Sequence, residues 1–423
     1  MRAGVAILLL AQLAGVAWCQ QDSISVASQS DFNNILNVNI QCASYKLPEV
    51  DQLLEKTRFP PVGQIASIPD DDTNAQDAWN NILNSGIIPS DVEVKKDNDD
   101  NHASVNQDGY NATDPDCWYT ASQCTKPKHL NLTLDLTDCP TPSTLGFTIG
   151  DAPNCSHNLL YNSFEAKKIK ATLFYVGSNV INYPYQAQRG ITDGHDICVQ
   201  SWSNPYLTTL PNDQVFAELY YTALAIKAVL GVTPTCWRPP FGDLDDRVRA
   251  IAYGLGLRTI MYAEDVSSGS GGYRRVTGMA SSSSPIVQFH ETSNSTMTAL
   301  NGSLSDLLDA YKLVMPITAC MNITHPYTEN IAYPNFLQAQ KPFKYTNLPL
   351  STDISTNPSP KYVVSSLSEM DYGFANSLNA TGTNATFPAK TDASDSAASL
   401  AQVPSLGTLA ATVMILAVSQ SCL

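Results

Sequence analysis

Residue types that bind metals or transfer protons stand at the ends of several short apolar runs. The stretch GFTIGDAPNCSHN leads from β-branched and aromatic residues into an acidic turn at Asp151, Asp265 closes the stretch MYAED, and His290 lies in VQFHE. Carboxylates and imidazoles serve as zinc ligands and as general acids or bases, and barrel enzymes carry such groups at strand ends. The pattern indicates an active site or the remains of one. Taken alone, Asp151 also fits a turn residue or a helix cap.

The elements that would position these residues alternate along the chain. Short buried strands are predicted at residues 145–149, 171–176, 197–200, 259–262 and 286–289. Apolar side chains at three-to-four spacing predict a helix over residues 212–230, capped by Asn212, and a second helix is expected after Asp243. Strands that alternate with helices favour a parallel sheet with the helices outside, and about 200 residues suffice to close such a sheet into a barrel.

Taken in order, the strand ends form the series FTIGDAP, VQSWSNP, WRPPFGD, MYAED and VQFHE. This series, with connecting text such as QRGITDGHDICV and PFGDLDDRVRAIA, resembles the polysaccharide deacetylase family, and in particular its fungal chitin deacetylases, over about residues 115–335. The resemblance implies an α/β fold, a deformed (β/α) barrel of the polysaccharide deacetylase type. It also implies removal of acetyl groups from N-acetylglucosamine units with a divalent metal, usually zinc.

The implied chemistry needs a metal-bound water and a base, and the sequence departs from the family at both. Asp151 matches the metal-binding aspartate, but Gly150 stands where the family has its basic aspartate. Gln200 and Asn204 replace the two metal-binding histidines, which lie four residues apart. Amide oxygens are weak ligands for zinc. The sequence therefore predicts no bound cofactor, and zinc or cobalt is expected only if the metal site is altered rather than lost.

Two other histidines, His157 and His195, lie near the predicted strands and are the candidates for such an altered site. Related chitin deacetylases carry histidines at both places beside an intact metal site, which favours a role in the scaffold instead.

Several family positions are kept. Arg238 matches the residue that orients the base, His290 the catalytic acid, and Asp265 the residue that tunes this acid. Without a metal, His290 also fits a structural histidine, and Arg238 is expected to pair with Asp243 or Asp265. Gln288 replaces a leucine expected to line a pocket for the acetyl methyl group, and a tryptophan-bearing motif has become EDVSSGSG. The resemblance therefore covers the scaffold better than the catalytic groups.

Aromatic residues near the expected barrel mouth are the candidate sugar-binding surface, because aromatic faces stack well on apolar surfaces and carry a polar edge. An equally weighted interpretation places the same side chains in the core. The candidates are Trp202, Trp237, Phe241 and Tyr262.

Charge and cysteine content restrict the partners and the compartment. The formal net charge of −15 argues against nucleic acid, whose phosphates need basic patches. After removal of the two ends discussed next, eight of the ten cysteines remain, an even number that favours disulfides in an oxidising compartment without fixing their pairing. They are Cys42, Cys117, Cys124, Cys139, Cys155, Cys198, Cys236 and Cys320.

Both ends of the chain resemble processing signals. Residues 1–19 have the basic start, short apolar stretch and small residues of a secretory signal peptide. Residues 397–423 match a glycosylphosphatidylinositol (GPI) propeptide that follows an attachment site at Ser396, with Ser394 or Asp395 as alternative sites and an ordinary tail anchor as the alternative interpretation. Between them we expect a loosely ordered N-terminal extension at 20–115, a deacetylase-like domain at 116–335 and a Ser/Thr/Asn-rich glycosylated stalk at 336–396. Glycosylation sequons occur at Asn111, Asn131, Asn154, Asn294, Asn301, Asn322, Asn379 and Asn384.

The leading hypothesis is a secreted, GPI-anchored protein of the fungal plasma membrane or cell wall that binds chitin or chitosan without zinc-dependent deacetylation. Cell-wall glucan or the membrane would then be a partner through the anchor, and the sequence leaves the oligomeric state open. A second hypothesis is an active chitin deacetylase with an altered metal site. A third is a structural cell-wall mannoprotein.

Overall fold

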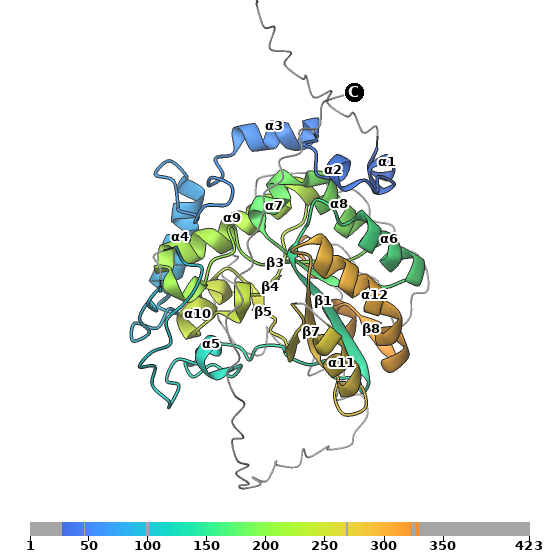
Figure 1. Cartoon of the computed structure of the whole chain (residues 1–423). Coiled ribbons are helices and arrows are strands. Elements are labelled where there is room, and N and C mark those ends of the chain that lie inside the picture. The colour runs from blue at the N-terminus through green and yellow to red at the C-terminus, as the bar shows by residue number, and fades with distance from the viewer. Residues whose placement is uncertain (1–27, 46, 99–100, 268–269, 324–325, 330–423) are drawn as a thin grey trace, which may run out of the picture. The chain divides into compact units, whose positions relative to one another are not determined.

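The computed structural model describes residues 28–45, 47–98, 101–267, 270–323 and 326–329 (Figure 1). The expected signal peptide, the whole of the expected stalk with its sequons at Asn379 and Asn384, Ser396 and the expected GPI propeptide lie outside these ranges. No helix within them is both long and apolar enough to cross a membrane.

Eight parallel strands form one sheet in the order β5-β4-β3-β2-β1-β7-β6, with β8 paired to β1. The two ends of this order, β5 and β6, are not paired with each other in the described part of the chain, so the sheet is a curled half-barrel that stays open. The predicted α/β fold class is confirmed. The strands are β1 (Thr144–Ala152), β2 (Thr172–Tyr175), β3 (Asp196–Val199), β4 (Cys236–Trp237), β5 (Arg258–Thr259), β6 (Glu264–Asp265), β7 (Ile286–His290) and β8 (Leu313–Met315).

Helices surround these strands in Figure 1. Helix α9 matches the predicted range, but Pro211 rather than Asn212 is its N-cap, and it ends at Gly231, whose φ of +79° suits glycine. The helices of the domain are α5 (Tyr119–Ser122), α6 (Asn158–Lys167), α7 (Gly177–Asn182), α8 (Pro184–Thr192), α9 (Asn212–Leu230), α10 (Asp246–Gly254), α11 (Ser270–Met279), α12 (Asn294–Ala310) and α13 (Ile317–Cys320), with short 3₁₀ turns η1 (Leu207–Thr209) and η2 (Pro240–Gly242).

The N-terminal extension is ordered, and the expectation of a loose segment is wrong for its described residues. It forms α1 (Gln29–Asn33), α2 (Val38–Gln41), α3 (Pro48–Lys56) and α4 (Thr73–Ser85). Helices α3 and α4 contact α9, and the charged run after them is also held, because the Lys95 backbone N–H donates to the Thr208 carbonyl at 2.8 Å. The apolar residues within 20–115 show little helical periodicity, so the sequence alone did not predict these helices. Contacts with the rest of the domain hold them in place.

Ile82 of α4 provides a test of that packing. It is 1% exposed, and a Cβ added at Gly254 of α10 would meet Ile82 at 2.9 Å, so the two helices are in close contact. Replacing Ile82 by alanine should lower the free energy of unfolding by about 2–4 kcal/mol. The neighbouring Leu83, 46% exposed, is the control, and L83A should cost less than about 1 kcal/mol. Equal, small effects in denaturant unfolding would show a loose extension after all.

Four disulfides join the eight cysteines that the sequence singled out: Cys42–Cys155, Cys117–Cys124, Cys139–Cys320 and Cys198–Cys236. The first ties the extension to the turn after β1 across 113 residues of sequence. Such cross-links are typical of proteins in oxidising compartments.

Candidate functional site

The register of the central strands brings the predicted site residues to one end of the sheet. In the β1–β7 pair, Gly150 lies opposite His290, so Asp151 follows directly beside the end of β7. In the β6–β7 pair, Asp265 lies opposite Gln288. Because all these strands are parallel, their carboxyl ends form a common mouth, where barrel proteins place their functional groups. This register brings Asp151, Asp265 and His290, three candidate site residues, to the same mouth.

His290 bridges the two carboxylates of this mouth. Its Nδ1 donates to Asp151 Oδ2 and its Nε2 donates to Asp265 Oδ1, each at 2.7 Å. Carboxylates only accept hydrogen bonds, so both ring nitrogens carry protons and the ring is an imidazolium. Burial disfavours this charge, but the hydrogen bonds that His290 donates to Asp151 and Asp265 outweigh it and raise the pKa of His290 to about 9. Burial likewise acts to raise the pKa of Asp151, yet its bonds to His290 and the amides lower it.

The protonation state of His290 is a direct prediction. Its ring signals in nuclear magnetic resonance should titrate near pH 9, not near the ordinary value of about 6.5. The pKa of His290 is higher in the folded chain than in the unfolded chain. The stability that protonated His290 contributes is therefore complete below about pH 6.5 and is lost as the pH rises through about 9. The variant D151N should return the titration toward the ordinary value. A midpoint near 6.5 in the unmodified chain would refute this arrangement.

Two carboxamides surround Asp151 where the family has histidines. Gln200 Nε2 donates to Asp151 Oδ1 at 2.8 Å and to Asn204 Oδ1 at 2.6 Å, while Gln200 Oε1 accepts from the Asp151 backbone N–H at 2.9 Å. Asn204 Nδ2 lies 3.4 Å from the same Asp151 oxygen. Asp151 and Asn204 adopt left-handed backbone angles, with φ of 62° and 66°, which aspartate and asparagine tolerate better than most residues. The amides and Asp151 thus satisfy one another.

This arrangement does not fit a zinc ion. The oxygens of Asp151 and Asn204 that would face a cation converge instead on an N–H donor, the Gln200 amide nitrogen. The other Asp151 oxygen is bonded to His290. Zinc needs imidazole, thiolate or carboxylate ligands around it, and an N–H group repels it.

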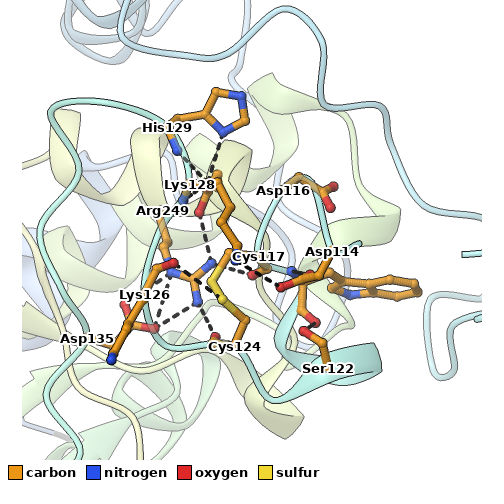
Figure 2. Close-up of a disulfide and its surroundings, with 12 residues drawn as sticks. Asp114, Asp116, Cys117, Ser122, Cys124, Lys126, Lys128, His129, Asp135 and Arg249 are labelled. Atoms are coloured by element: carbon orange, nitrogen blue, oxygen red, sulfur yellow. Dashed lines mark hydrogen bonds and ion pairs between the residues drawn. A yellow bond between two sulfur atoms is a disulfide. The ribbon is translucent and has the colours of Figure 1, made fainter. Parts of the chain in front are cut away.

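No other residues rebuild a metal centre in the part of the chain that the structure describes. His157 is buried against Glu291, with Nδ1 to Oε1 at 2.8 Å, and His195 accepts the Ala171 backbone N–H at 3.0 Å. The one described group with three possible metal ligands is Asp114, Cys117 and Cys124, but the two sulfur atoms form a disulfide with each other (Figure 2). A disulfide sulfur is not a thiolate, which is the form that binds metals.

Arg238 is buried beside neutral acceptors, one of which is the Gln288 side chain. The guanidinium is 1% exposed and donates to Thr148 Oγ1 at 2.6 Å and to Gln288 Oε1 at 2.9 Å. Burial lowers the pKa of Arg238 to about 9. A Cβ added at Gly150 would lie 3.0 Å from Gln288 Nε2, so the Gln288 side chain fills the space of a residue-150 side chain.

The expected ion pair of Arg238 with Asp243 or Asp265 is wrong for the described residues, where Arg238 is in no salt bridge. Asp243 instead accepts from the Trp118 indole N–H at 3.0 Å and from the Thr208 backbone and hydroxyl at 2.8 and 2.7 Å. Asp265 accepts from His290. The sequence could not show this, because the partners of Asp243 are more than 30 residues away.

Two of the four candidate sugar-binding aromatics lie in the core. Trp202 and Trp237 are fully buried. Trp202 stacks on Phe59 of the extension with ring centroids 5.8 Å apart, and Trp237 donates to Thr259 Oγ1 at 3.0 Å. The role of these two residues in sugar stacking is therefore not supported, because the extension covers one and the barrel encloses the other.

The remaining candidates, Phe241 and Tyr262, line an open groove beside the mouth. Phe241 is 49% exposed and stacks on Tyr206 at 4.5 Å, with a left-handed φ of 57°. Tyr119 of α5 faces Tyr262 edge-on at 5.9 Å and completes an aromatic surface that the motifs did not predict. The groove is lined by Tyr119, Thr120, Gln123, Phe241, Tyr262, Ala263, Glu264 and Asp265. Asp265 connects the groove to the mouth.

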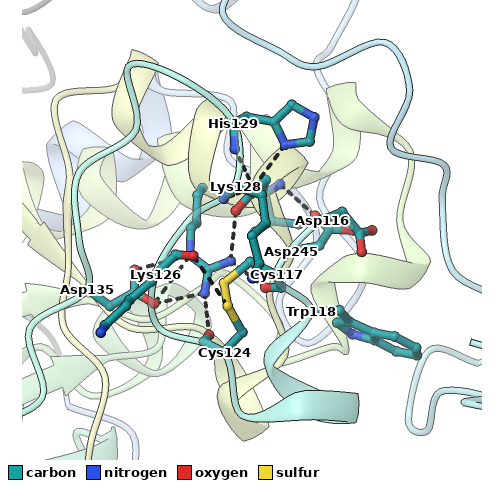
Figure 3. A network of polar contacts seen from close by, with 12 residues as sticks. Asp116, Cys117, Trp118, Cys124, Lys126, Lys128, His129, Asp135 and Asp245 are labelled. Atoms are coloured by element: carbon teal, nitrogen blue, oxygen red, sulfur yellow. Dashed lines mark hydrogen bonds and ion pairs between the residues drawn. A yellow bond between two sulfur atoms is a disulfide. The ribbon is translucent and has the colours of Figure 1, made fainter. Parts of the chain in front are cut away.

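A disulfide and a buried ion network fix the short loop that carries α5. The Cys117–Cys124 disulfide closes the loop, and Arg249 donates to the carbonyls of Cys117 and Cys124 at 2.6 and 2.9 Å (Figure 2). Arg249 also pairs with Asp135 at 2.8 Å. Figure 3 shows the network extending to Lys128 and His129. The groove wall is thus rigid, which favours a preformed binding surface.

Comparison with known proteins shows the family of this chain. The family profile described as Polysaccharide deacetylase matches residues 137–260. Chitin deacetylase 2 of Cryptococcus neoformans var. grubii is 41% identical over 338 residues, which cover 74% of this chain and 71% of that protein. The chain belongs to the polysaccharide deacetylase family. This family member is also 43% identical to a chitin deacetylase of Amylomyces rouxii over 57% of this chain and 61% of the relative.

Among solved structures, this deacetylase-family chain is similar to the chitin deacetylase of Colletotrichum lindemuthianum. The TM-score is 0.42 at 19% identity, over 45% of this chain and 92% of that chain.

The described sequons differ in exposure. Four of their asparagines are exposed and two, Asn154 and Asn301, are half-buried. Asn154 is also engaged, because its Oδ1 accepts from the Ser156 backbone and hydroxyl at 3.0 and 2.9 Å. The exposed asparagines, which remain the better candidates for glycosylation, are Asn111, Asn131, Asn294 and Asn322.

Proposed function

We propose that this chain is a chitin deacetylase-like protein that binds an aminosugar polymer, chitin or chitosan, without hydrolysing its acetamide groups. One observation carries the absence of hydrolysis: Gln200 Nε2 stands 2.8 Å from Asp151 Oδ1 and 2.6 Å from Asn204 Oδ1, in the position where a cation would meet these oxygens. Without a metal to acidify water, and with Gly150 in the place of the base, no group activates a nucleophile.

The retained groove supports the binding part of the proposal. Its wall combines exposed aromatic surface at Phe241 with the polar side chains of Thr120, Gln123 and Asp265. Sugars offer apolar ring faces and many hydroxyl groups, so such a mixture suits them. The names of the Cryptococcus and Amylomyces relatives indicate chitin as the polymer.

The proposal also includes the location of the protein at the cell surface. Four disulfides fit a secreted protein, and the sequence signals add attachment through a GPI anchor at Ser396. Binding at the plasma membrane or in the wall would then position the groove against chitin-containing layers.

The test measures binding and hydrolysis together. The secreted protein should bind chitin or chitosan oligomers, measured by calorimetry, and should release no acetate from chitin oligomers with or without added zinc or cobalt. Acetate release that depends on added metal would instead establish an active deacetylase with an altered site. If no oligomer binds, the groove is not a sugar site and a structural wall protein becomes the better account.

A further inference from the structure

The groove beside the mouth has a charge pattern that makes the proposed function more specific. Two carboxylates, Glu264 and Asp265, and three aromatic rings line it, and among the residues that the structure describes no lysine, arginine or histidine does. We infer that this groove selects the deacetylated, cationic form of the polymer, with free ammonium groups, over the N-acetylated form. The inference rests on the proposed function, because it assumes that an aminosugar polymer occupies the groove.

Both carboxylates retain capacity for a cationic ligand. Asp265 accepts from His290 through Oδ1 at 2.7 Å, and it also receives a hydrogen bond from Tyr262. Glu264 pairs with Arg275 of α11, with Nε to Oε1 at 2.7 Å, but the Arg275 side chain is 62% exposed and does not line the groove. Because Arg275 lies largely in solvent and Glu264 is 19% exposed, the pair is partly exposed, and such a pair contributes only modestly to stability. A sugar ammonium group has three donors and forms the stronger, charge-assisted type of hydrogen bond with such oxygens.

The aromatic rings favour the same form of the ligand. Tyr119 and Tyr262 meet edge-on in the groove wall, and Phe241 exposes its ring beside them. Aromatic faces attract cations as well as sugar rings. A neutral acetamide gains only the stacking part of this interaction.

The mouth of the sheet provides no apolar site beside Gly150 for the methyl group of an acetylated sugar. The space beside Gly150 is bordered by the amides of Gln288 and Gln200, at 3.0 and 3.4 Å from a Cβ placed there. An acetyl methyl group would meet Gln288 Nε2, whose amide oxygen accepts from Arg238, and Gln200 Oε1, which accepts from the Asp151 backbone N–H. Burying a methyl group against such amides gains little hydrophobic stabilisation. At long range, the net charge of −15 attracts a polycation and not a neutral polymer.

The experiment compares the tetramer of glucosamine with the tetramer of N-acetylglucosamine by calorimetry at low and high salt. The deacetylated tetramer should bind roughly tenfold more tightly at low salt, with the difference shrinking as salt screens it. Equal binding, or tighter binding of the acetylated tetramer, overturns the inference and leaves the proposed function intact. Binding of neither tetramer overturns both.

Single substitutions test whether the groove residues cause the selectivity for the deacetylated tetramer. E264Q should weaken binding of the deacetylated tetramer about threefold or more and leave the acetylated one unchanged. D309N is the control, since Asp309 is an exposed acid on α12 outside the groove. R275Q should tighten binding of the deacetylated tetramer by freeing Glu264, and Y119A should weaken both ligands. If E264Q and D309N weaken binding equally, the selectivity comes from overall charge and the assignment to this groove is wrong.

Discussion

The variant G150D/Q200H/N204H/Q288L should bind one zinc ion per chain and release acetate from chitin oligomers, whereas the unmodified chain should do neither. Two imidazoles at positions 200 and 204 would remove the amide N–H that now faces Asp151 Oδ1, and would complete an Asp-His-His ligand set of the kind zinc accepts. The backbone at position 150 allows an aspartate, because Gly150 is not among the glycines with positive φ. The scaffold around the mouth is therefore suited to the restored groups.

Two intermediate variants separate the metal from the base. Q200H/N204H/Q288L, which keeps Gly150, should bind zinc as well as the full variant but release acetate about 10²–10⁴-fold more slowly, because the general base is missing. G150D/Q200H/N204H should also be slow, since Gln288 would crowd the new carboxylate at 3.0 Å from its Cβ. Failure of the full variant to bind zinc would mean that Gly150, Gln200, Asn204 and Gln288 are not what prevents this mouth from holding a metal ion.

Exchanging Gln288 for leucine in the otherwise unmodified chain should lower the free energy of unfolding by about 1.5–3 kcal/mol. Arg238 is buried, and Gln288 Oε1 is one of its two side-chain acceptors, at 2.9 Å. Leucine would leave that part of a buried cation without a partner. The G150D change alone should also destabilise, by about 1–3 kcal/mol, because its side chain would overlap that of Gln288.

The double variant G150D/Q288L is the informative one. With Gln288 gone, the new carboxylate at position 150 has room near Arg238, so the pair should cost less than the sum of the single changes by at least about 1 kcal/mol. Denaturant unfolding of the four proteins measures this coupling. Strictly additive losses would show that Gln288 has not replaced the lost carboxylate as the partner of Arg238.

Local sequence pattern was sufficient for the continuous elements of the fold. Strands β1, β2, β3 and β7 and helix α9 are long apolar or amphipathic runs, and the structure places them within a few residues of the predicted ranges. Strands β4, β6 and β8 have two or three residues each, and β5 pairs at Arg258–Thr259 instead of extending to Tyr262. Elements so short carry no periodicity, and their existence depends on neighbouring strands.

The sequence was enough to identify candidate site residues at the strand ends. It was not enough to predict which side chains pack against them. The strand ends placed Asp151, Asp265 and His290 together. The sequence did not show that the Gln288 side chain fills the space beside Gly150, because the two residues belong to strands that are far apart in the sequence. The burial of Trp202 was missed for a similar reason, since Phe59 of the extension covers it.

The most direct test of the central claim is zinc analysis of the unmodified secreted chain. After equilibration with zinc and removal of free ions, elemental analysis should find well below one zinc ion per chain, because the Gln200 amide nitrogen and His290 satisfy both oxygens of Asp151. One tightly held zinc ion per chain that is lost in D151N would contradict the account, since it would require Asp151, Gln200 and Asn204 to rearrange into a ligand set.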